Sequence, residues 1–179
     1  MVDPVTRHRL AYRLLFVGLA ALVLFVRMLP LGAVPARVPG PDLILCGTIA
    51  WVLRRPDYAP AGLIAAVFLM EDILAMRAPG LWPVVVLMGT EFLRSREAGF
   101  RDLPFALEWV IAGALIVAMT VIHGIVLAAF LVPQAPAGLT ASQTVVTILA
   151  YPGVVFLAHF VFGLRKAAHG QVDAFGHRI

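Results

Sequence analysis

The chain has 179 residues, of which 61% are hydrophobic and only 13% are charged, and its mean hydropathy is +0.95. A soluble domain has about 45–50% apolar and about 25% charged residues, so this composition excludes an ordinary water-soluble domain and indicates one embedded in lipid. At about 20 residues for each membrane-crossing helix, the length allows about six helices and leaves no room for a separate soluble domain. We therefore expect a single all-α integral membrane domain over residues 1–179.

The formal net charge of +4 would suit nucleic acid, but the basic residues lie in short segments between apolar runs. Such basic loops are typical of the cytoplasmic side of a membrane protein. The only cysteine, Cys46, lies within an apolar run, so we expect neither an internal disulfide nor a cysteine metal site. The sequence predicts no cofactor, no metal ion and no nucleic-acid partner.

Six apolar runs, separated by Pro, Gly or charged residues, predict six transmembrane helices. The first run follows a basic segment but lacks a convincing small-residue cleavage site, so we expect an uncleaved helix and not a signal peptide. The second and fourth runs are short for a full crossing, so these helices are expected to be thin, tilted or begun inside a loop. The six helices are expected at about 10–29, 43–53, 58–76, 81–93, 104–132 and 143–164.

Local signals set several of these boundaries. A proline-rich loop begins at Pro30, where the first helix stops. Asp42 is well placed to cap the second helix, because a carboxylate accepts from the free amides of a first turn. Pro56 helps to end the second helix, and Pro79 with Gly80 predicts a tight reversal between the third and fourth helices.

The distribution of Lys and Arg predicts the orientation in the membrane. With the amino terminus inside, three basic residues fall on the outer side: Arg27, Arg37 and Arg77. The other eleven fall on the cytoplasmic side: Arg7, Arg9, Arg13, Arg54, Arg55, Arg94, Arg96, Arg101, Arg165, Lys166 and Arg178. This asymmetry predicts that both termini are cytoplasmic.

Two adjacent acids, Glu71 and Asp72, lie in the last third of the third helix. Ionised groups at membrane depth are costly and normally face protein or water, and the negative carbonyl end of a helix makes carboxylates there less favourable still. Arg77 is five and six residues further on, off the positions that share a helix face with the acids. Arg27, at the outer end of the first helix, or a basic residue of another subunit is therefore the better partner.

The face of the third helix that carries Asp72 also carries small residues. The stripe consists of Gly62, Ala65, Leu69, Asp72 and Met76. Small residues allow helices to approach closely, so this stripe predicts that Asp72 points into the packed side. The pair of acids is either a charge-paired packing element or partner contact, or a proton or ion site of a transporter. The scarcity of other polar groups in the apolar runs favours the first reading.

The sequence shows no arrangement typical of an enzyme. His123 and His159 are single histidines on apolar helices and lack the converging ligands that a metal site needs. The serines and threonines form no nucleophile arrangement, and no glycine-rich loop suits a phosphate. We therefore expect a non-enzymatic protein.

The segment WVLRRPDYAPAGLIAAVFLMEDILAMRAPGLW, residues 51–82, resembles the central region of the bacterial rod shape-determining protein MreD family. That family shows an aromatic residue, Arg-Pro after the second helix, a third helix with Gly and an inner Asp, and a turn with Pro and Gly. These places are taken here by Trp51, Arg55, Pro56, Gly62, Asp72, Pro79 and Gly80. The chain departs from the family in having Glu71 before the inner Asp and Ala75 where a Gly often follows the Leu-rich core.

The resemblance implies a scaffold subunit of the cell-elongation machinery, which maintains rod shape and builds peptidoglycan at the bacterial inner membrane. It implies as partners an MreC-like protein, an MreB-like actin homologue, RodA with its transpeptidase, and membrane lipid. The family is also similar in fold to the S-components of energy-coupling-factor transporters, so the alternative is a substrate-binding membrane subunit of a vitamin transporter. The structural or partner-binding residues would be Arg55, Pro56, Gly62, Glu71, Asp72, Arg77, Pro79 and Gly80.

The two functions predict different features. A scaffold predicts helix faces used for protein packing and no deep polar pocket, whereas a transporter subunit predicts an outward cavity lined by polar and aromatic groups. An S-component also commonly carries Ala-x-x-x-Ala on its first helix, where this chain has only Gly18-Leu19-Ala20-Ala21. The outer loop after the fifth helix, which has no charge, offers little to hold a polar vitamin. Both observations favour the scaffold.

Overall fold

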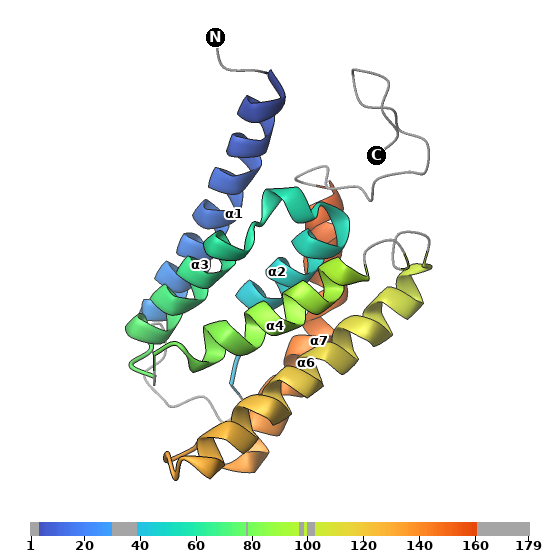
Figure 1. Ribbon diagram of the computed structural model, residues 1–179. Helices are drawn as coiled ribbons and strands as arrows, with labels where there is room; N and C mark the ends of the chain where they lie inside the picture. The colour runs from blue at the N-terminus through green and yellow to red at the C-terminus, as the bar shows by residue number, and fades with distance from the viewer. Residues whose placement is uncertain (1–3, 30–38, 78, 97–98, 100–102, 161–179) are drawn as a thin grey trace.

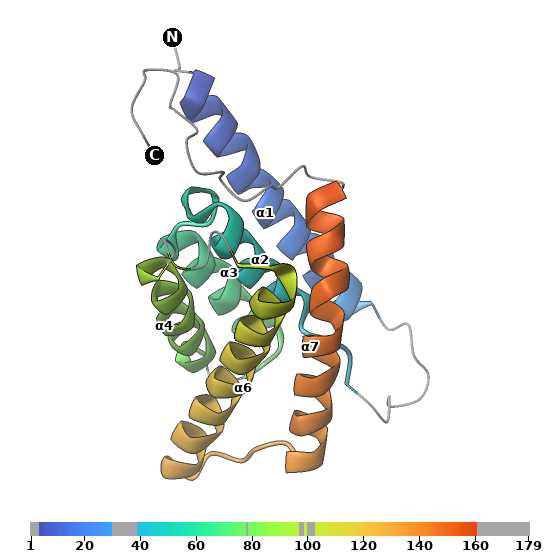
Figure 2. The same cartoon turned by 90° about the vertical axis from the view of Figure 1, so that its right-hand side faces the viewer.

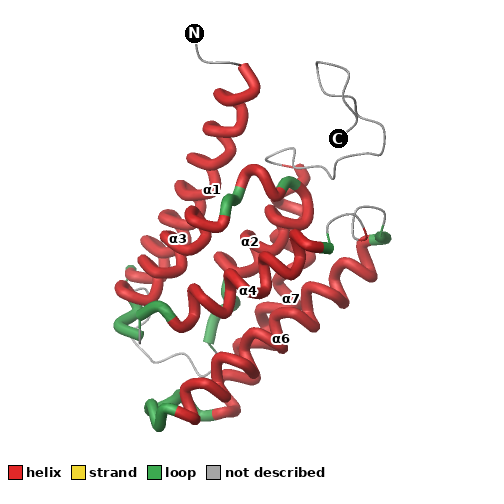
Figure 3. The backbone as a smooth tube through the Cα atoms, viewed as in Figure 1, coloured by secondary structure: helices red, strands yellow, loops and turns green. Residues whose placement is uncertain are grey.

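The structure is a computed structural model that describes residues 4–29, 39–77, 79–96, 99 and 103–160 (Figure 1). Every regular element in these ranges is helical, which confirms the all-α class there (Figure 3). The elements are α1 (Pro4–Met28), α2 (Leu43–Arg54), the 3-10 helix η1 (Pro56–Tyr58), α3 (Ala61–Leu74), α4 (Leu81–Ser95), α6 (Phe105–Ala129) and α7 (Ala137–Phe160). Several expected features lie outside the described residues: most of the proline-rich loop, Arg37, Arg101, the end of the last helix at 161–164, and the basic tail.

Three of the helices are long and apolar enough to cross a membrane: Arg9–Met28 within α1, Phe105–Ala129 and Ala137–Phe160. The others are shorter, with 12 residues in α2, 14 in α3 and 15 in α4. At about 1.5 Å per residue they span roughly 18–23 Å, less than the hydrocarbon core of about 30 Å. The prediction of short second and fourth helices is confirmed. The third is also shorter than expected, because η1 and Pro60 precede it and because it ends at Leu74.

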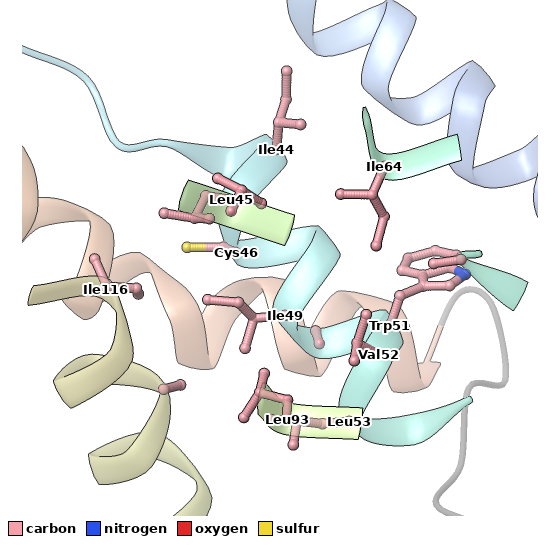
Figure 4. Packing of buried hydrophobic residues seen from close by; sticks show 14 of the residues in the cluster. Ile44, Leu45, Cys46, Ile49, Trp51, Val52, Leu53, Ile64, Leu93 and Ile116 are labelled. Carbon is pink, nitrogen blue, oxygen red and sulfur yellow. The ribbon is translucent and has the colours of Figure 1, made fainter. Parts of the chain in front are cut away.

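The centre of the molecule is α2, which lies among α1, α4 and α7 (Figure 4). Ten of its twelve residues are buried, and Ile49, Ala50 and Cys46 are inaccessible to solvent. The Cys46 thiol donates to the Thr147 carbonyl oxygen of α7 at 3.3 Å. A helix that is apolar on all sides must be enclosed by other elements or by lipid, and here most of α2 is enclosed by protein.

The start of α2 follows the predicted cap. The Asp42 carboxylate accepts from the Leu45 amide at 3.0 Å, as an N-cap residue does. The Asp42 amide in turn donates to the Thr147 hydroxyl at 2.9 Å, which fixes the start of α2 against the middle of α7. The cap is therefore also a contact between two helices.

The buried face of α3 is not the stripe that the sequence suggested. The buried residues are Ile64, Val67, Phe68, Glu71 and Asp72, spaced as one helical face. Of the stripe, only Asp72 is buried, whereas Gly62 and Leu69 are exposed and Met76 lies beyond the end of the helix. The prediction that Asp72 points into the packed side is confirmed, but the rest of the stripe does not form the packed face. Because α3 is apolar on nearly every side, small residues alone did not identify that face.

The first helix is fixed to the rest of the chain near both of its ends. Near its start, the Tyr12 ring stacks on the Tyr58 ring of η1 with centroids 4.6 Å apart. Near its end, Arg27 reaches α3. Between these contacts, one side of α1 exposes large apolar residues, as expected for a surface that faces lipid: Leu14, Leu22, Phe25 and Val26.

Candidate functional site

Five charged side chains meet where α1 and α3 end and α2 begins. We call Arg27, Asp42, Glu71, Asp72 and Arg77 the Asp42 cluster, and this end of the molecule the Asp42 end. Arg27 Nη1 donates to Glu71 Oε1 at 2.8 Å, while Nη2 donates to the Pro41 carbonyl oxygen at 2.9 Å and lies 3.5 Å from Asp42 Oδ1. The predicted pairing of Arg27 with the acids of α3 is therefore present for Glu71.

Arg77 also pairs with both acids, contrary to the prediction that it lies off their face. Its Nη2 is 3.3 Å from Glu71 Oε1, and its Nε is 3.2 Å from Asp72 Oδ1. The prediction was wrong because it extended the helix to residue 76, whereas α3 ends at Leu74. Met76 has a left-handed backbone with φ of 51°, and the Arg77 amide donates to the Asp72 carbonyl oxygen at 3.0 Å. The chain thereby folds back over the end of the helix.

Asp72 also joins α3 to the next helix. Its Oδ2 accepts from the Gly80 amide at 3.1 Å, and Gly80 precedes α4 with φ of 99°. That left-handed conformation is open to glycine and strained for other residues, which explains the residue type at this turn. The predicted reversal at Pro79 and Gly80 is confirmed, with Pro79 exposed within it.

The charges of the Asp42 cluster do not balance. It contains three carboxylates and two guanidinium groups, a difference of one negative charge (3 − 2 = 1) when all five are ionised. The three acids are buried. Glu71 Oε2 has no hydrogen-bond partner among the described residues. Buried carboxylate oxygens normally accept hydrogen bonds, so the cluster can accommodate one more cationic group or hydrogen-bond donor.

A cavity of about 480 Å³ adjoins the cluster, within the range of about 300–1,000 Å³ that is typical of small-molecule sites. It reaches the core residues Leu45 and Ile116, and a polar cavity of this kind is a feature that the transporter alternative predicts and the scaffold hypothesis does not. Its polar and aromatic lining comprises Asp42, Arg77, Trp82, Thr120, His123, Gln134, Thr140, Gln143, Thr144 and Thr147.

The structure separates the predicted site residues into two groups. Glu71, Asp72, Arg77 and Gly80 come together at the Asp42 end. Arg55 and Pro56 lie at the opposite end of α2, where Arg55 caps that helix and Pro56 begins η1. Gly62 is exposed on α3, with open space where a side chain would project.

A second buried cluster was not predicted. At the other end of α2, Arg54 Nη1 donates to Glu108 Oε1 at 2.9 Å, and the Tyr151 hydroxyl donates to the same oxygen at 2.9 Å. This Arg54 cluster joins α2, α6 and α7. Arg54 lies at the end of the second predicted helix and Glu108 near the start of the fifth, which the predicted topology places on the same side of the membrane, so their opposite charges were the available signal. Nothing in the sequence pointed to Tyr151.

An apolar groove of about 350 Å³ lies between α1, α2 and α7. Its floor is α2, and its walls are α1 and α7. Five small residues line it: Ala20, Gly47, Ala150, Gly153 and Ala158. A methyl group added at Gly47 or Gly153 would meet no atom within 4 Å, so both glycines border open space.

In comparisons with known proteins, no family model matches the chain, and no curated protein or solved structure matches it. Its function is therefore inferred from its own residues and their geometry.

Proposed function

We propose that the chain is a non-enzymatic scaffold subunit of a bacterial cell-elongation complex, similar to the MreD family. The observation that carries this proposal is the apolar groove between α1, α2 and α7. The resemblance of residues 51–82 to that family supplies the identity of the complex.

The groove suits a transmembrane helix of a partner protein. Helices in lipid gain little from apolar burial alone, and they associate through close packing, which small residues permit. Gly47 on the floor and Gly153 on one wall leave space for a helix backbone to approach. A lipid chain needs no such small residues, because it packs equally well against larger apolar side chains. A single-pass protein such as an MreC-like anchor has one transmembrane helix, which would occupy the groove.

In the proposed topology all six helices lie in the inner membrane, with the Asp42 end outside and both termini in the cytoplasm. The charge distribution supports this orientation, because the Asp42 end holds only Arg27 and Arg77 among the described basic residues. The short helix α4 packs against both α2 and α3, and each of the three short helices also contacts at least one long helix. Protein surroundings of this kind allow segments shorter than the bilayer to remain at membrane depth.

The scaffold would hold its partners by position, with no chemical step. Two buried ionic clusters fix the ends of α2 against α1, α3, α6 and α7, which gives a rigid frame around the groove. In this proposal the partner helix lies in the groove, and RodA and its transpeptidase lie nearby in the membrane. The basic cytoplasmic loops face an MreB-like filament and anionic lipid, which attract Lys and Arg.

Affinity purification in mild detergent tests the proposal. The tagged chain, expressed in its own host, should recover an MreC-like protein. Gly47→Leu places a large side chain in the groove, starting from a Cβ position that has no other atom within 4 Å. Because a blocked helix contact costs about 1–2 kcal/mol, we expect it to lower recovery about tenfold.

Gly18→Leu is the matched control. Gly18 lies on α1, exposed and outside the groove lining, and a Cβ added there also has no other atom within 4 Å. It should leave recovery unchanged. Equal recovery with Gly47→Leu and Gly18→Leu would contradict a partner helix in the groove.

The cavity at the Asp42 end favours a second candidate, a substrate-binding membrane subunit of an energy-coupling-factor type transporter. Its lining combines polar and aromatic groups on the side proposed to be outward, as such a subunit requires. The same purification distinguishes the two functions, because a transporter subunit should bring down a pair of ATPases in place of an MreC-like protein.

A further inference from the structure

The cavity lies in a recess formed by unequal helix positions. The Asp42 amide at the start of α2 meets Thr147 in the middle of α7, and Trp82 in the first turn of α4 packs edge-on against His123 of α6 at 5.1 Å. Helices α6 and α7 therefore continue past the starts of α2 and α4, as Figure 2 shows. Residues 132–135 connect the two long helices and complete the recess.

The electrostatics of this recess favour a cation. Three helices end and three begin at the Asp42 end, so the partial charges of their termini largely offset one another. The charges of the side chains therefore determine the potential, and with all five groups ionised the Asp42 cluster carries one negative charge in excess. Asp42 is the carboxylate of the cluster that lines the cavity. Arg77 also lines it, but its guanidinium is held 3.3 Å from Glu71 and 3.2 Å from Asp72.

The hydroxyl groups of the lining present acceptors. The Thr120 hydroxyl donates to the Ile116 carbonyl oxygen at 2.9 Å, and the Thr144 hydroxyl donates to the Thr140 carbonyl oxygen at 2.8 Å. Because each hydroxyl proton is engaged within its own helix, the free lone pairs can only accept. A ligand that matches these hydroxyls must bring donors, and an acceptor on the ligand would also satisfy the buried Trp82 Nε1–H, which has no partner among the described residues. The rings of Trp82 and His123 add aromatic surface, and an indole attracts cations.

From these three observations we propose that the cavity is a binding site for a small organic cation, an amine that makes further hydrogen bonds through donors of its own. The ammonium lies toward Asp42, and the body of the molecule contacts Trp82 and the threonines of α6 and α7. The volume fits a molecule of roughly amino-acid to nucleoside size. The proposal goes beyond the scaffold function and does not depend on it, because the site is formed by this chain alone.

Three leucine derivatives of similar size and different charge test the proposal on the purified full chain in lipid nanodiscs. Leucinamide carries an ammonium, N-acetylleucinamide is neutral and N-acetylleucine carries a carboxylate. Thermal unfolding and tryptophan emission report binding, since none of the three absorbs with tryptophan. An excess charge a few ångströms away in a partly dry site should make leucinamide bind at least about tenfold more tightly than N-acetylleucine.

The decisive variant is Asp42→Asn, because asparagine also caps helices and keeps the shape of the side chain. It should weaken leucinamide binding about tenfold and change N-acetylleucinamide binding by less than about twofold, since only the charge is lost. Asp57→Asn, which neutralises an exposed carboxylate of η1 at the other end of α2, should change neither.

If Asp42→Asn fails to fold, Thr144→Val takes its place, because it removes one acceptor from the cavity wall and should weaken leucinamide binding several-fold. Absence of leucinamide binding, equal binding of the cation and the anion, or full leucinamide affinity in the folded variant would each overturn the proposal. None of these outcomes bears on partner recovery through the groove, so this site and the scaffold function fail separately.

Discussion

The two buried ionic clusters at the ends of α2 differ in balance and in surroundings. The Arg54 cluster has one cation, one anion and one hydroxyl that meet at a single carboxylate oxygen. The Asp42 cluster has three anions and two cations, includes a carboxylate oxygen without a donor among the described residues, and borders a cavity. The first is a closed structural contact between helices, whereas the second, with all five groups ionised, is one positive charge short of balance.

This difference bears on how buried charges are interpreted in membrane proteins. A balanced buried pair contributes specificity of packing, and its individual members are costly to remove because the other charge is left without a partner. An unbalanced cluster beside a cavity is a better candidate for binding, because a ligand can supply what the fold leaves out. The two ends of α2 therefore predict different responses to the same substitutions.

The largest effect is expected for Glu108→Ala. The side chains of Arg54 and Glu108 are only 7% and 4% exposed, so loss of the carboxylate leaves a buried guanidinium and the Tyr151 hydroxyl without their acceptor. Removing one partner of such a pair costs about 3–5 kcal/mol, and we expect the free energy of unfolding to fall by about 3 kcal/mol. Unfolding in mixed micelles with increasing denaturing detergent measures it.

Glu91→Ala is the control for that variant. Glu91 pairs with Arg94 at 3.2 Å, but its side chain is 53% exposed. Exposed pairs contribute about 0–1 kcal/mol, so this variant should unfold almost as the parent does. Similar losses for Glu108→Ala and Glu91→Ala would show that the Arg54 cluster is not a buried structural contact.

A smaller and more discriminating effect is expected from the amide variants Glu71→Gln and Glu108→Gln. The glutamine at 108 retains an acceptor for Tyr151 but leaves Arg54 buried and uncompensated. The glutamine at 71 retains an acceptor for Arg27 and Arg77 and brings the Asp42 cluster to two anions against two cations (3 − 1 = 2). We therefore expect Glu71→Gln to cost about 1 kcal/mol or less, and clearly less than Glu108→Gln.

The same unfolding measurement compares the two amide variants directly. If the glutamine at 71 is as costly as the glutamine at 108, the Asp42 cluster is already balanced by a group that the described residues do not include. If it costs less, the excess negative charge is a property of the chain itself.

Features set by neighbouring residues or by helix order could be predicted from the sequence. The cap at Asp42 and the reversal at Gly80 depend on a few adjacent positions, and both are present. The contact of Arg27 with Glu71 follows from topology, because the first helix ends on the side where the third ends. The short lengths of α2 and α4 follow from the prolines and charges that bound them.

Features set by packing could not be predicted in this way. The pairing of Arg77 depends on where α3 ends, and an apolar sequence contains no signal for that boundary. Because α3 is apolar on nearly every side, the sequence also did not show which of its faces is buried, and Gly62 was wrongly predicted to lie on the packed face. The cavity depends on how far α6 and α7 extend, and α7 begins at Ala137 and not near the expected residue 143. Tyr151 is distant in sequence from Glu108, to which it donates, and from Arg54, so no local pattern links it to the Arg54 cluster.

A further small effect is expected at the turn that closes the Asp42 cluster. Gly80→Ala places a side chain at φ of 99°, where residues other than glycine are strained by about 1–2 kcal/mol. The strain shifts the Gly80 amide, which donates to Asp72, so we expect a loss of about 1 kcal/mol in stability. Thermal unfolding in nanodiscs measures it.

Gly62→Ala provides the comparison for that turn, because the substitution is the same and the backbone differs. Gly62 lies within α3, exposed and with open space around it, where alanine favours the helix by about 0.5–1 kcal/mol. The two variants should therefore shift the unfolding temperature in opposite directions. A shift in the same direction would mean that the left-handed turn does not maintain the Asp42 cluster, and that the Asp72 and Arg77 side chains hold α3 and α4 together without it.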